Sequence, residues 1–147
     1  MEMPGKDRQT CYFESTIMKR NFEELELQHD QSYNCDGKPF HGVCVYRSLD
    51  GAIESEVSFI DGVQSGGFTD YHSNGTPSCT GTIANGVYHG TLTHWNSEGV
   101  MTRVETYEYG ICTSRKEYSE TGSIISEFEI QNDDPNFQLL LAFRKTY

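Results

Sequence analysis

The sequence predicts a mainly β fold: one elongated, twisted, antiparallel sheet of stacked β-hairpins, followed by a short C-terminal helix. Three observations lead to this prediction. Glycines recur with a period of about 24 residues, the segments between them alternate apolar and polar side chains, and residues 133–147 begin with a helix start signal. The chain has 147 residues, of which 35% are hydrophobic. This length suits about one domain, and the low apolar fraction indicates a thin fold with much exposed surface.

The repeat consists of four series of residues with one common spacing, as expected when each repeat is a single supersecondary unit. The series are Gly37, Gly62, Gly86 and Gly110; Gly42, Gly66 and Gly90, with Ser114 in the fourth place; Gly51, Gly75, Gly99 and Gly122; and the aromatic residues Tyr46, Tyr71, Trp95 and Tyr118. Glycine, and asparagine before it as in Asn85-Gly86, allows the positive φ angles of tight hairpin turns. Each unit is therefore predicted to be one hairpin, which gives about eight strands in total. The units cover about residues 37–61, 62–85, 86–109 and 110–132.

Side-chain alternation within the units supports the strands. Residues 53–59 and 124–130 each place apolar side chains on alternate positions, with glutamates on the positions between them. One apolar face and one acidic face is the pattern of a sheet that is covered on one side only. A single hairpin is barely stable in water, so each unit is expected to need its neighbours.

The segment before the first unit carries weaker strand signals. Residues 1–10 are predicted to be a flexible leader. The segment from Tyr12 to Met18 has strand character, and alternating leucine and glutamate favour a strand from Glu24 to His29. We expect this segment to form a half-hairpin that caps the first edge of the sheet, so that the β-repeat domain spans residues 11–132.

The tail, residues 133–147, is predicted to be a capping helix. Asp134 can cap its start and Pro135 fits the first turn. Arg144 and Lys145 come near its end, where the helix dipole favours positive charge. We expect the helix to lie over the edge of the last hairpin and to hide its open strand. Docking of this helix to a partner is the alternative.

The charge of the chain limits the classes of molecule that it is expected to bind. It has 11 Lys and Arg against 22 Asp and Glu, a net charge of −11, which disfavours direct binding to nucleic acid. No apolar stretch approaches the ~20 residues of a membrane-spanning helix. The N-terminus lacks the pattern of a secretory signal, so we expect a cytoplasmic protein without membrane contact. Five cysteines, an odd number without a Cys-x-x-Cys motif, indicate reduced thiols.

The unit over residues 86–99, with its Gly-x-x-His-Gly start, its aromatic residue and its closing glycine, resembles the MORN repeat (membrane occupation and recognition nexus). More closely, it is similar to the bacterial MORN variant of YwqK-type antitoxins. The segment 36–46 carries the same pattern, and the resemblance covers about residues 33–131, with departures at Ser114 and Trp95. It implies an elongated sheet of stacked hairpins. It also implies an immunity protein of a toxin–antitoxin system used in bacterial competition, which binds a cognate toxin domain and blocks its active site or substrate access.

Candidate catalytic and metal-binding residues are few. Stacked repeats could bring His72 and His94 together, but no acid or thiol obviously joins them, so we expect no metal site. Glu54 and Glu56 share a solvated face, where nothing would raise the pKa of one of them for acid–base catalysis. A phosphate-binding glycine-loop motif does not occur. We therefore expect neither enzymatic activity nor a cofactor, while a nucleophilic cysteine–histidine pair stays open.

The acidic balance favours a partner-binding surface instead. A basic toxin, including one directed at nucleic acid, would be steered onto such a surface at high rate. The expected patch is formed by Glu54, Glu56, Asp70, Tyr71, His72, His94, Trp95, Glu127 and Glu129. A β-bulge would move part of this patch to the other face of the sheet. The alternative function is a MORN-repeat scaffold for protein–protein or membrane-associated assembly, although the net charge argues against binding to anionic lipid.

Overall fold

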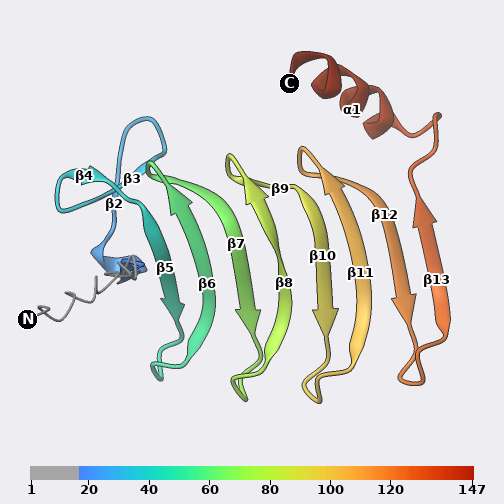
Figure 1. Ribbon diagram of the computed structural model, residues 1–147, viewed down its shortest axis with the longest axis horizontal. Helices are drawn as coiled ribbons and strands as arrows, with labels where there is room; N and C mark the ends of the chain where they lie inside the picture. The colour runs from blue at the N-terminus through green and yellow to red at the C-terminus, as the bar shows by residue number, and fades with distance from the viewer. Residues whose placement is uncertain (1–16) are drawn as a thin grey trace, which may run out of the picture.

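The computed structural model describes residues 17–147. Its main feature is one open sheet in which the strands follow each other almost in chain order (Figure 1). The order is β1-β5-β6-β7-β8-β10-β11-β12-β13, with β9 paired to β8, and a separate small sheet contains β2, β3 and β4. Strand β1 runs parallel to β5, whereas the long strands pair antiparallel. The predicted mainly β class is confirmed.

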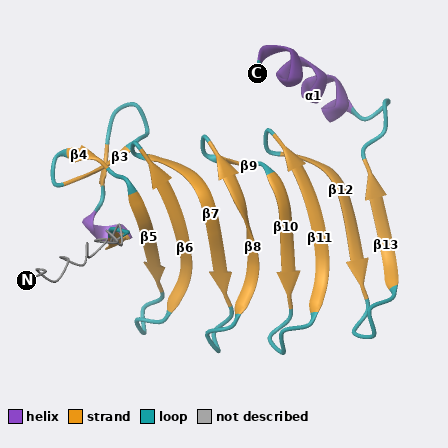
Figure 2. Ribbon diagram, in the orientation of Figure 1, coloured by secondary structure: helices purple, strands orange, loops and turns teal. Residues whose placement is uncertain are grey.

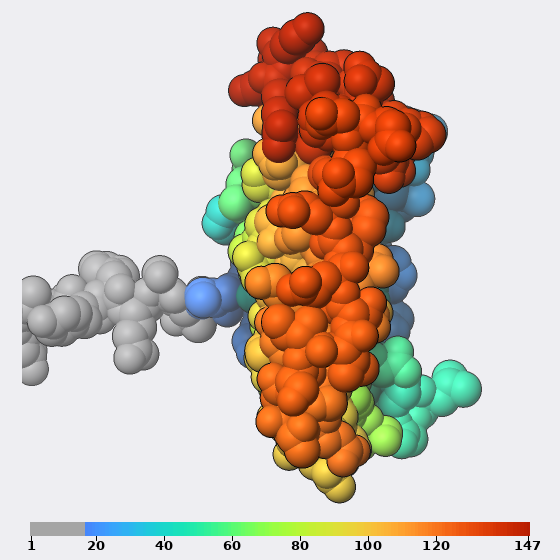
Figure 3. Space-filling view, turned by 90° about the vertical axis from the view of Figure 1, so that its right-hand side faces the viewer, coloured from blue at the N-terminus to red at the C-terminus, as the bar shows by residue number. Residues whose placement is uncertain are grey.

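The strands of the main sheet are β1 (Lys19–Asn21), β5 (Gly42–Arg47), β6 (Ile53–Ile60), β7 (Val63–Tyr71), β8 (Pro77–Ala84), β9 (Val87–Tyr88), β10 (Gly90–Trp95), β11 (Met101–Glu108), β12 (Ile111–Tyr118) and β13 (Ile124–Glu129). The remaining elements are the 3-10 helix η1 (Phe22–Glu24), the short strands β2 (Glu26–Leu27), β3 (Tyr33–Cys35) and β4 (Lys38–Pro39), and the helix α1 (Pro135–Thr146). Figure 2 shows the sheet as a single layer with α1 beyond the ends of its strands. Seen along its edge in Figure 3, the molecule is narrow.

Each predicted unit contributes two long strands. Two of the three glycine series lie at the turns, whereas Gly42, Gly66 and Gly90 lie within β5, β7 and β10. At the turn between β8 and β9, Asn85 and Gly86 have φ angles of 49° and 83°, the backbone of a type I′ hairpin turn. The amide of Gly86 donates a hydrogen bond of 2.9 Å to the carbonyl of Gln64, just past the preceding turn. Equivalent bonds join Gly62 to Phe40 and Gly110 to Tyr88. The turns are therefore stacked through main-chain hydrogen bonds, which accounts for the constant period.

At the other end of the strands, five-residue loops close the hairpins. In the loop between β10 and β11, the Oδ1 atom of Asn96 accepts hydrogen bonds of 3.0 Å from the amides of Glu98 and Val100. The fourth residue of this loop is Gly99, whose φ of 83° suits glycine. Gly51, Gly75 and Gly122 hold the same position in the other units, with φ between 85° and 89°.

The two faces of the sheet differ in composition. Residues paired directly across antiparallel strands lie on the same face, so the register of the strands assigns each row of side chains to one face. On the core face, buried apolar side chains form one cluster that includes Cys44, Val57, Phe59, Phe68, Cys79, Ile83 and Leu92. On the opposite face, a single row contains Glu56, Thr69, Thr80, Thr93, Val104, Lys116 and Glu127, and we call it the threonine face.

The predicted aromatic series is wrong in its first member. A register shift follows Tyr46, as it follows Asp70 and His94 in the next units. Tyr46 pairs with Ser55 on the core face and is therefore equivalent to Asp70 and His94. The residue equivalent to Tyr71, Trp95 and Tyr118 is Arg47, which begins the shifted pairing. The error comes from the spacing of 25 residues between Tyr46 and Tyr71, one more than the period of 24, because an offset of one residue along a strand moves a side chain to the other face.

The N-terminal flank differs from the expected half-hairpin. The predicted leader 1–10 and nearly all of the predicted strand 12–18 lie outside the described residues. Of the strand expected from Glu24 to His29, only β2 is extended, and it belongs to the small sheet. A 3-10 turn comes first, because Glu24 accepts a hydrogen bond of 2.8 Å from the amide of Asn21. The ring of Phe22 then stacks on Tyr46 at 4.9 Å, which fixes this turn against the sheet.

The C-terminal helix is confirmed, but its position differs from the expectation. Asp134 caps α1 by accepting a hydrogen bond of 2.8 Å from the amide of Asn136. The helix turns back over the loop between β11 and β12, where Phe143 packs on Tyr109 at 5.7 Å and Arg144 pairs with Glu108. It does not cover the last strand, and every residue of β13 is exposed. The predicted burial of one face over 124–130 is therefore wrong, because β13 has no covering layer (Figure 1).

Candidate binding surfaces

A buried carboxylate organises the centre of the core face. Glu105 on β11 is only 4% exposed. Its Oε1 atom lies 2.7 Å from Nε2 of His94 on β10. Its Oε2 atom accepts hydrogen bonds from Nε of Arg115 on β12 at 3.0 Å and from the hydroxyl of Tyr107 at 3.3 Å. These partners replace the water that a buried carboxylate loses, so the charge is compensated inside the sheet.

The pKa of Glu105 reflects two opposing effects. Burial acts to raise the pKa of this carboxyl, because the charged form is poorly solvated. The hydrogen bonds from Arg115 and His94, together with the positive charge of Arg103, act in the other direction and hold the pKa below its ordinary value. Glu105 is therefore ionised at neutral pH, and it serves as the acceptor around which the basic side chains are arranged.

Cys79 lies next to this cluster, with its Sγ atom 3.8 Å from Nε2 of His94. The same nitrogen contacts Glu105, whereas a relay that activates a thiol uses one ring nitrogen for each partner. Burial, reinforced by the charges of Asp70 and Glu105, raises the pKa of the Cys79 thiol to about 11. The thiol is thus held in its protonated form. This geometry fits a packing role and not nucleophilic catalysis.

A hollow of about 530 Å³ opens over the cluster, and it brings together several of the predicted residues. Asp70, His72, His94 and Trp95 line it, together with Arg103. Nε2 of His72 lies 2.8 Å from the carbonyl of Trp95. The guanidinium of Arg103 stands between two carboxylates, 3.5 Å from Glu105 and 3.9 Å from Glu117. Mixed charges of this kind cancel locally, so the hollow has no strong preference for an anion or a cation.

The remaining predicted residues lie elsewhere. Glu56 and Glu127 lie on the threonine face, and the hydroxyl of Tyr71 donates a hydrogen bond of 3.0 Å to Glu56. Glu129 follows Glu127 on the same face of β13. Glu54, Tyr71 and His72 line a second hollow, next to the loop that closes the first hairpin. The nine residues are therefore divided between two faces and do not form one patch. The cause is the ordinary alternation of a strand, because the predicted patch combined consecutive residues such as Asp70 and Tyr71, which point to opposite faces of β7.

Sequence reasoning missed the residues at the centre of the core face. Within β11, simple alternation suggests that Val104 points inward and that Arg103 and Glu105 point to solvent, which is the reverse of the structure. The 24-residue period does place Glu105 on the correct face. Val57, Gly81 and Glu105 occupy the same position in successive units, and Val57 is a core residue, so the period assigns Glu105 to the core face as well.

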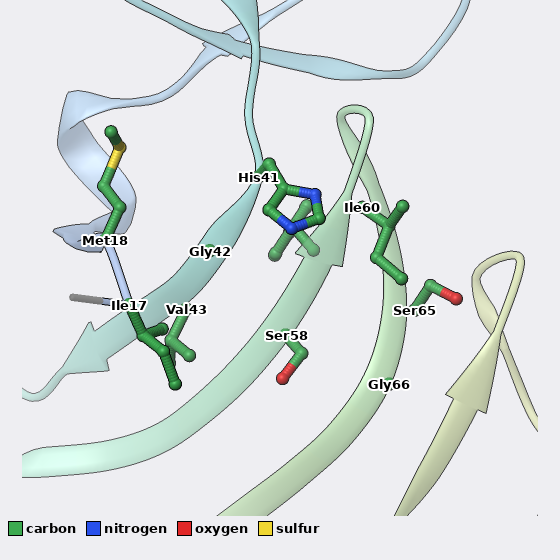
Figure 4. A pocket seen from close by; sticks show the side chains of 10 residues that line it. Ile17, Met18, His41, Gly42, Val43, Ser58, Ile60, Ser65 and Gly66 are labelled. Atoms are coloured by element: carbon green, nitrogen blue, oxygen red, sulfur yellow. The ribbon is translucent and has the colours of Figure 1, made fainter. Parts of the chain in front are cut away.

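An apolar hollow of about 560 Å³ lies near the start of the described chain (Figure 4). Ile17 and Met18 border it on one side, and Val43 and Ile60 contribute further apolar side chains. The amide of Val43 donates a hydrogen bond of 2.8 Å to the carbonyl of Met18, which continues the pairing of β1 with β5. This hollow is thus formed where the parallel edge strand joins the first hairpin.

Within residues 17–147, no group of three or more His, Cys, Asp or Glu side chains is arranged to hold a metal ion. The same part of the chain contains no helix with the length and apolar character needed to cross a membrane. The four cysteines of this part, Cys35, Cys44, Cys79 and Cys112, are free thiols. No protein-family model matches the sequence, and a search of curated proteins finds no match.

Proposed function

We propose that this chain is a cytoplasmic immunity protein that binds a cognate bacterial toxin domain and blocks its active site or substrate access. The observation that carries the proposal is the distribution of charge. Residues 48–102 contain six acidic residues and no lysine or arginine, and the same holds for residues 117–134. The acidic residues of the second segment are Glu117, Glu120, Glu127, Glu129, Asp133 and Asp134. Two long segments without lysine or arginine favour a partner of opposite charge.

This charge distribution supports a basic partner. Toxin domains that act on nucleic acid need positive charge around the active site to hold the phosphate backbone. An acidic protein is steered to such a surface and competes with the substrate for it. The single-layer sheet adds a second argument, since every residue of its last strand is exposed. Such a shape offers a large contact area for its size.

The scaffold function uses the same repeats but predicts different partners. A scaffold would hold several proteins at once, or would contact a membrane through basic patches. Residues 48–102 carry no lysine or arginine, which gives the membrane form no support there. The immunity function therefore makes the narrower prediction of one basic partner in a stoichiometric complex.

The test is affinity purification of the tagged full chain from its native cells, followed by mass spectrometry and by co-expression with the recovered partner. We expect one basic toxin domain in a stoichiometric complex, and we expect the chain to restore growth to cells that express the toxin. A charge variant with Glu120→Lys and Glu129→Lys should restore growth less well than the native chain, because it reduces the negative charge of the last hairpin. Recovery of several unrelated proteins or of lipid, or a failure to restore growth, would contradict the proposal and favour the scaffold.

A further inference from the structure

The last strand of the sheet has a free side. Among residues 17–147, strand β13 pairs with β12 only, and its six residues are all exposed. Seen from the side in Figure 3, β13 faces the viewer along its whole length. The opposite end of the sheet is different, because β1 pairs with β5 and η1 packs beside it. Proteins commonly cover or shorten a strand of this kind, since unpaired backbone groups attract another strand.

The hydrogen-bond pattern identifies which backbone groups are free. The amide of Ile130 donates a hydrogen bond of 2.9 Å to the carbonyl of Thr113 on the β12 side. In an antiparallel ladder, successive residues point their backbone groups alternately toward and away from the neighbour. Glu127 and Glu129 therefore direct their amide and carbonyl groups outward. They offer donors and acceptors at the spacing that an added strand requires.

The side chains of β13 specify the chemistry of that strand. Glu127 and Glu129 lie on the threonine face, whereas Phe128 lies on the core face and is 39% exposed. An added strand would therefore meet acidic side chains on one face and the apolar ring of Phe128 on the other. Lys116 lies opposite Glu127 on the β12 side, and the segment 117–134 that follows it has six acidic residues and no lysine or arginine.

We propose that β13 binds an extended strand of the basic partner, which pairs with the outward backbone groups of Glu127 and Glu129. The bound strand has lysine or arginine at alternate positions, opposite the two glutamates, and apolar residues between them that extend the core face beyond Phe128. This inference rests on the proposed function for the identity of the partner. A second copy of the chain is a poor occupant, because pairing two β13 strands would bring two acidic segments together.

A short peptide probe tests the site directly in the full chain. The probe is a capped hexapeptide of alternating lysine and valine, and the matched peptide has glutamate in place of lysine. Binding is followed by NMR, through amide shifts and amide hydrogen exchange. We expect the lysine peptide to shift the amides of β13 and to slow exchange at Glu127 and Glu129, which the added ladder protects. The glutamate peptide should cause no such change.

Two variants separate the contributions of charge and backbone. Glu127→Gln with Glu129→Gln should weaken binding about tenfold at low salt, since opposite charges across the pair are removed. The control, Glu23→Gln with Glu98→Gln, removes the same net charge at exposed positions and should change affinity by less than about twofold. Glu129→Pro removes one outward donor and should abolish the protection at this site, while the ladder to β12 is kept.

The outcomes are distinct. Peptide-induced changes outside β13, equal binding of the glutamate peptide, or binding unaffected by Glu129→Pro would overturn the proposed site. A toxin complex that forms equally well with Glu129→Pro would also overturn it, but would leave the immunity function standing. Peptide binding at β13 in a protein that neutralises no toxin would support the site and contradict the immunity function.

Discussion

Glu105 and Arg115 face each other across β11 and β12 at the position where Val57 and Phe68 face each other across β6 and β7. The same place in the repeat thus holds an apolar pair near the start of the sheet and an ion pair near its end. The Nε atom of Arg115 donates to Oε2 of Glu105 at 3.0 Å, and the carboxylate is buried. The core therefore changes from apolar contacts near β6 and β7 to an ion pair between β11 and β12.

Substitution of Glu105 by alanine should destabilise the protein. The change leaves Arg103 and Arg115 facing each other without their shared acceptor, and loss of one member of a buried ion pair costs about 3 kcal/mol. The free energy of unfolding in urea measures this loss. Glu120→Ala, in the exposed loop before β13, is the control and should change stability by less than about 0.5 kcal/mol. Similar values for the two variants would show that the cluster does not stabilise the sheet.

The contribution of Glu105 should depend on pH. Its pKa in the folded protein lies below the ordinary value of 4.5, so as pH falls the unfolded chain takes up a proton first. The stability that ionised Glu105 provides is therefore complete above pH 4.5 and decreases as the pH falls below that value. Comparing the unfolding free energies of the native chain and Glu105→Gln across this range isolates the effect. We expect the difference between them to shrink in acid, and a constant difference would contradict the assignment.

Two glycines on neighbouring strands should respond differently to alanine. A Cβ atom added at Gly81 would lie 2.8 Å from Leu92 in the core, whereas one added at Gly67 would meet nothing within 4 Å. Gly81→Ala should therefore destabilise the protein by about 1–3 kcal/mol through overpacking. Gly67→Ala, on the threonine face, should be neutral or slightly stabilising, because it restricts the unfolded chain. Thermal unfolding of both variants gives the comparison. Equal effects would contradict the assignment of Gly81 to the core face and of Gly67 to the threonine face.

The C-terminal helix should depend on one side chain. Leu140 is fully buried, whereas its neighbour Leu139 is 48% exposed. Leu140→Ala should cost about 2–4 kcal/mol, and Leu139→Ala less than about 0.5 kcal/mol. Hydrogen exchange should show faster opening of α1 in the first variant, with β5 to β8 unchanged, because distant repeats contact only their own neighbours. Uniformly faster exchange along the whole sheet would indicate that α1 stabilises more than its own end.

The features that could be predicted from the sequence are local ones. Asn85-Gly86 requires a particular turn wherever it occurs, and Asp134-Pro135 begins a helix without help from the rest of the chain. Which face a side chain occupies is not local, since a single bulge next to Tyr46 exchanges the faces. The predicted patch was divided between two faces because it combined consecutive residues such as Asp70 and Tyr71, and one of its members, His72, lies in the loop after β7. Glu105 was missed because an acidic residue within an alternating segment is ordinarily a surface residue.

The hydrogen bond that recurs between successive turns at the Asn-Gly end joins main-chain atoms, as in the bond from Gly86 to Gln64. This recurring bond needs no particular side chain, so it can form again wherever another unit is added. Excision of residues 62–85 would join Asp61 to Gly86 and recreate an Asp-Gly turn at the new junction. A gene for such a chain can therefore gain or lose length in whole hairpins, by duplication or deletion, and the distance between the two ends of the sheet can change while each end keeps its own chemistry.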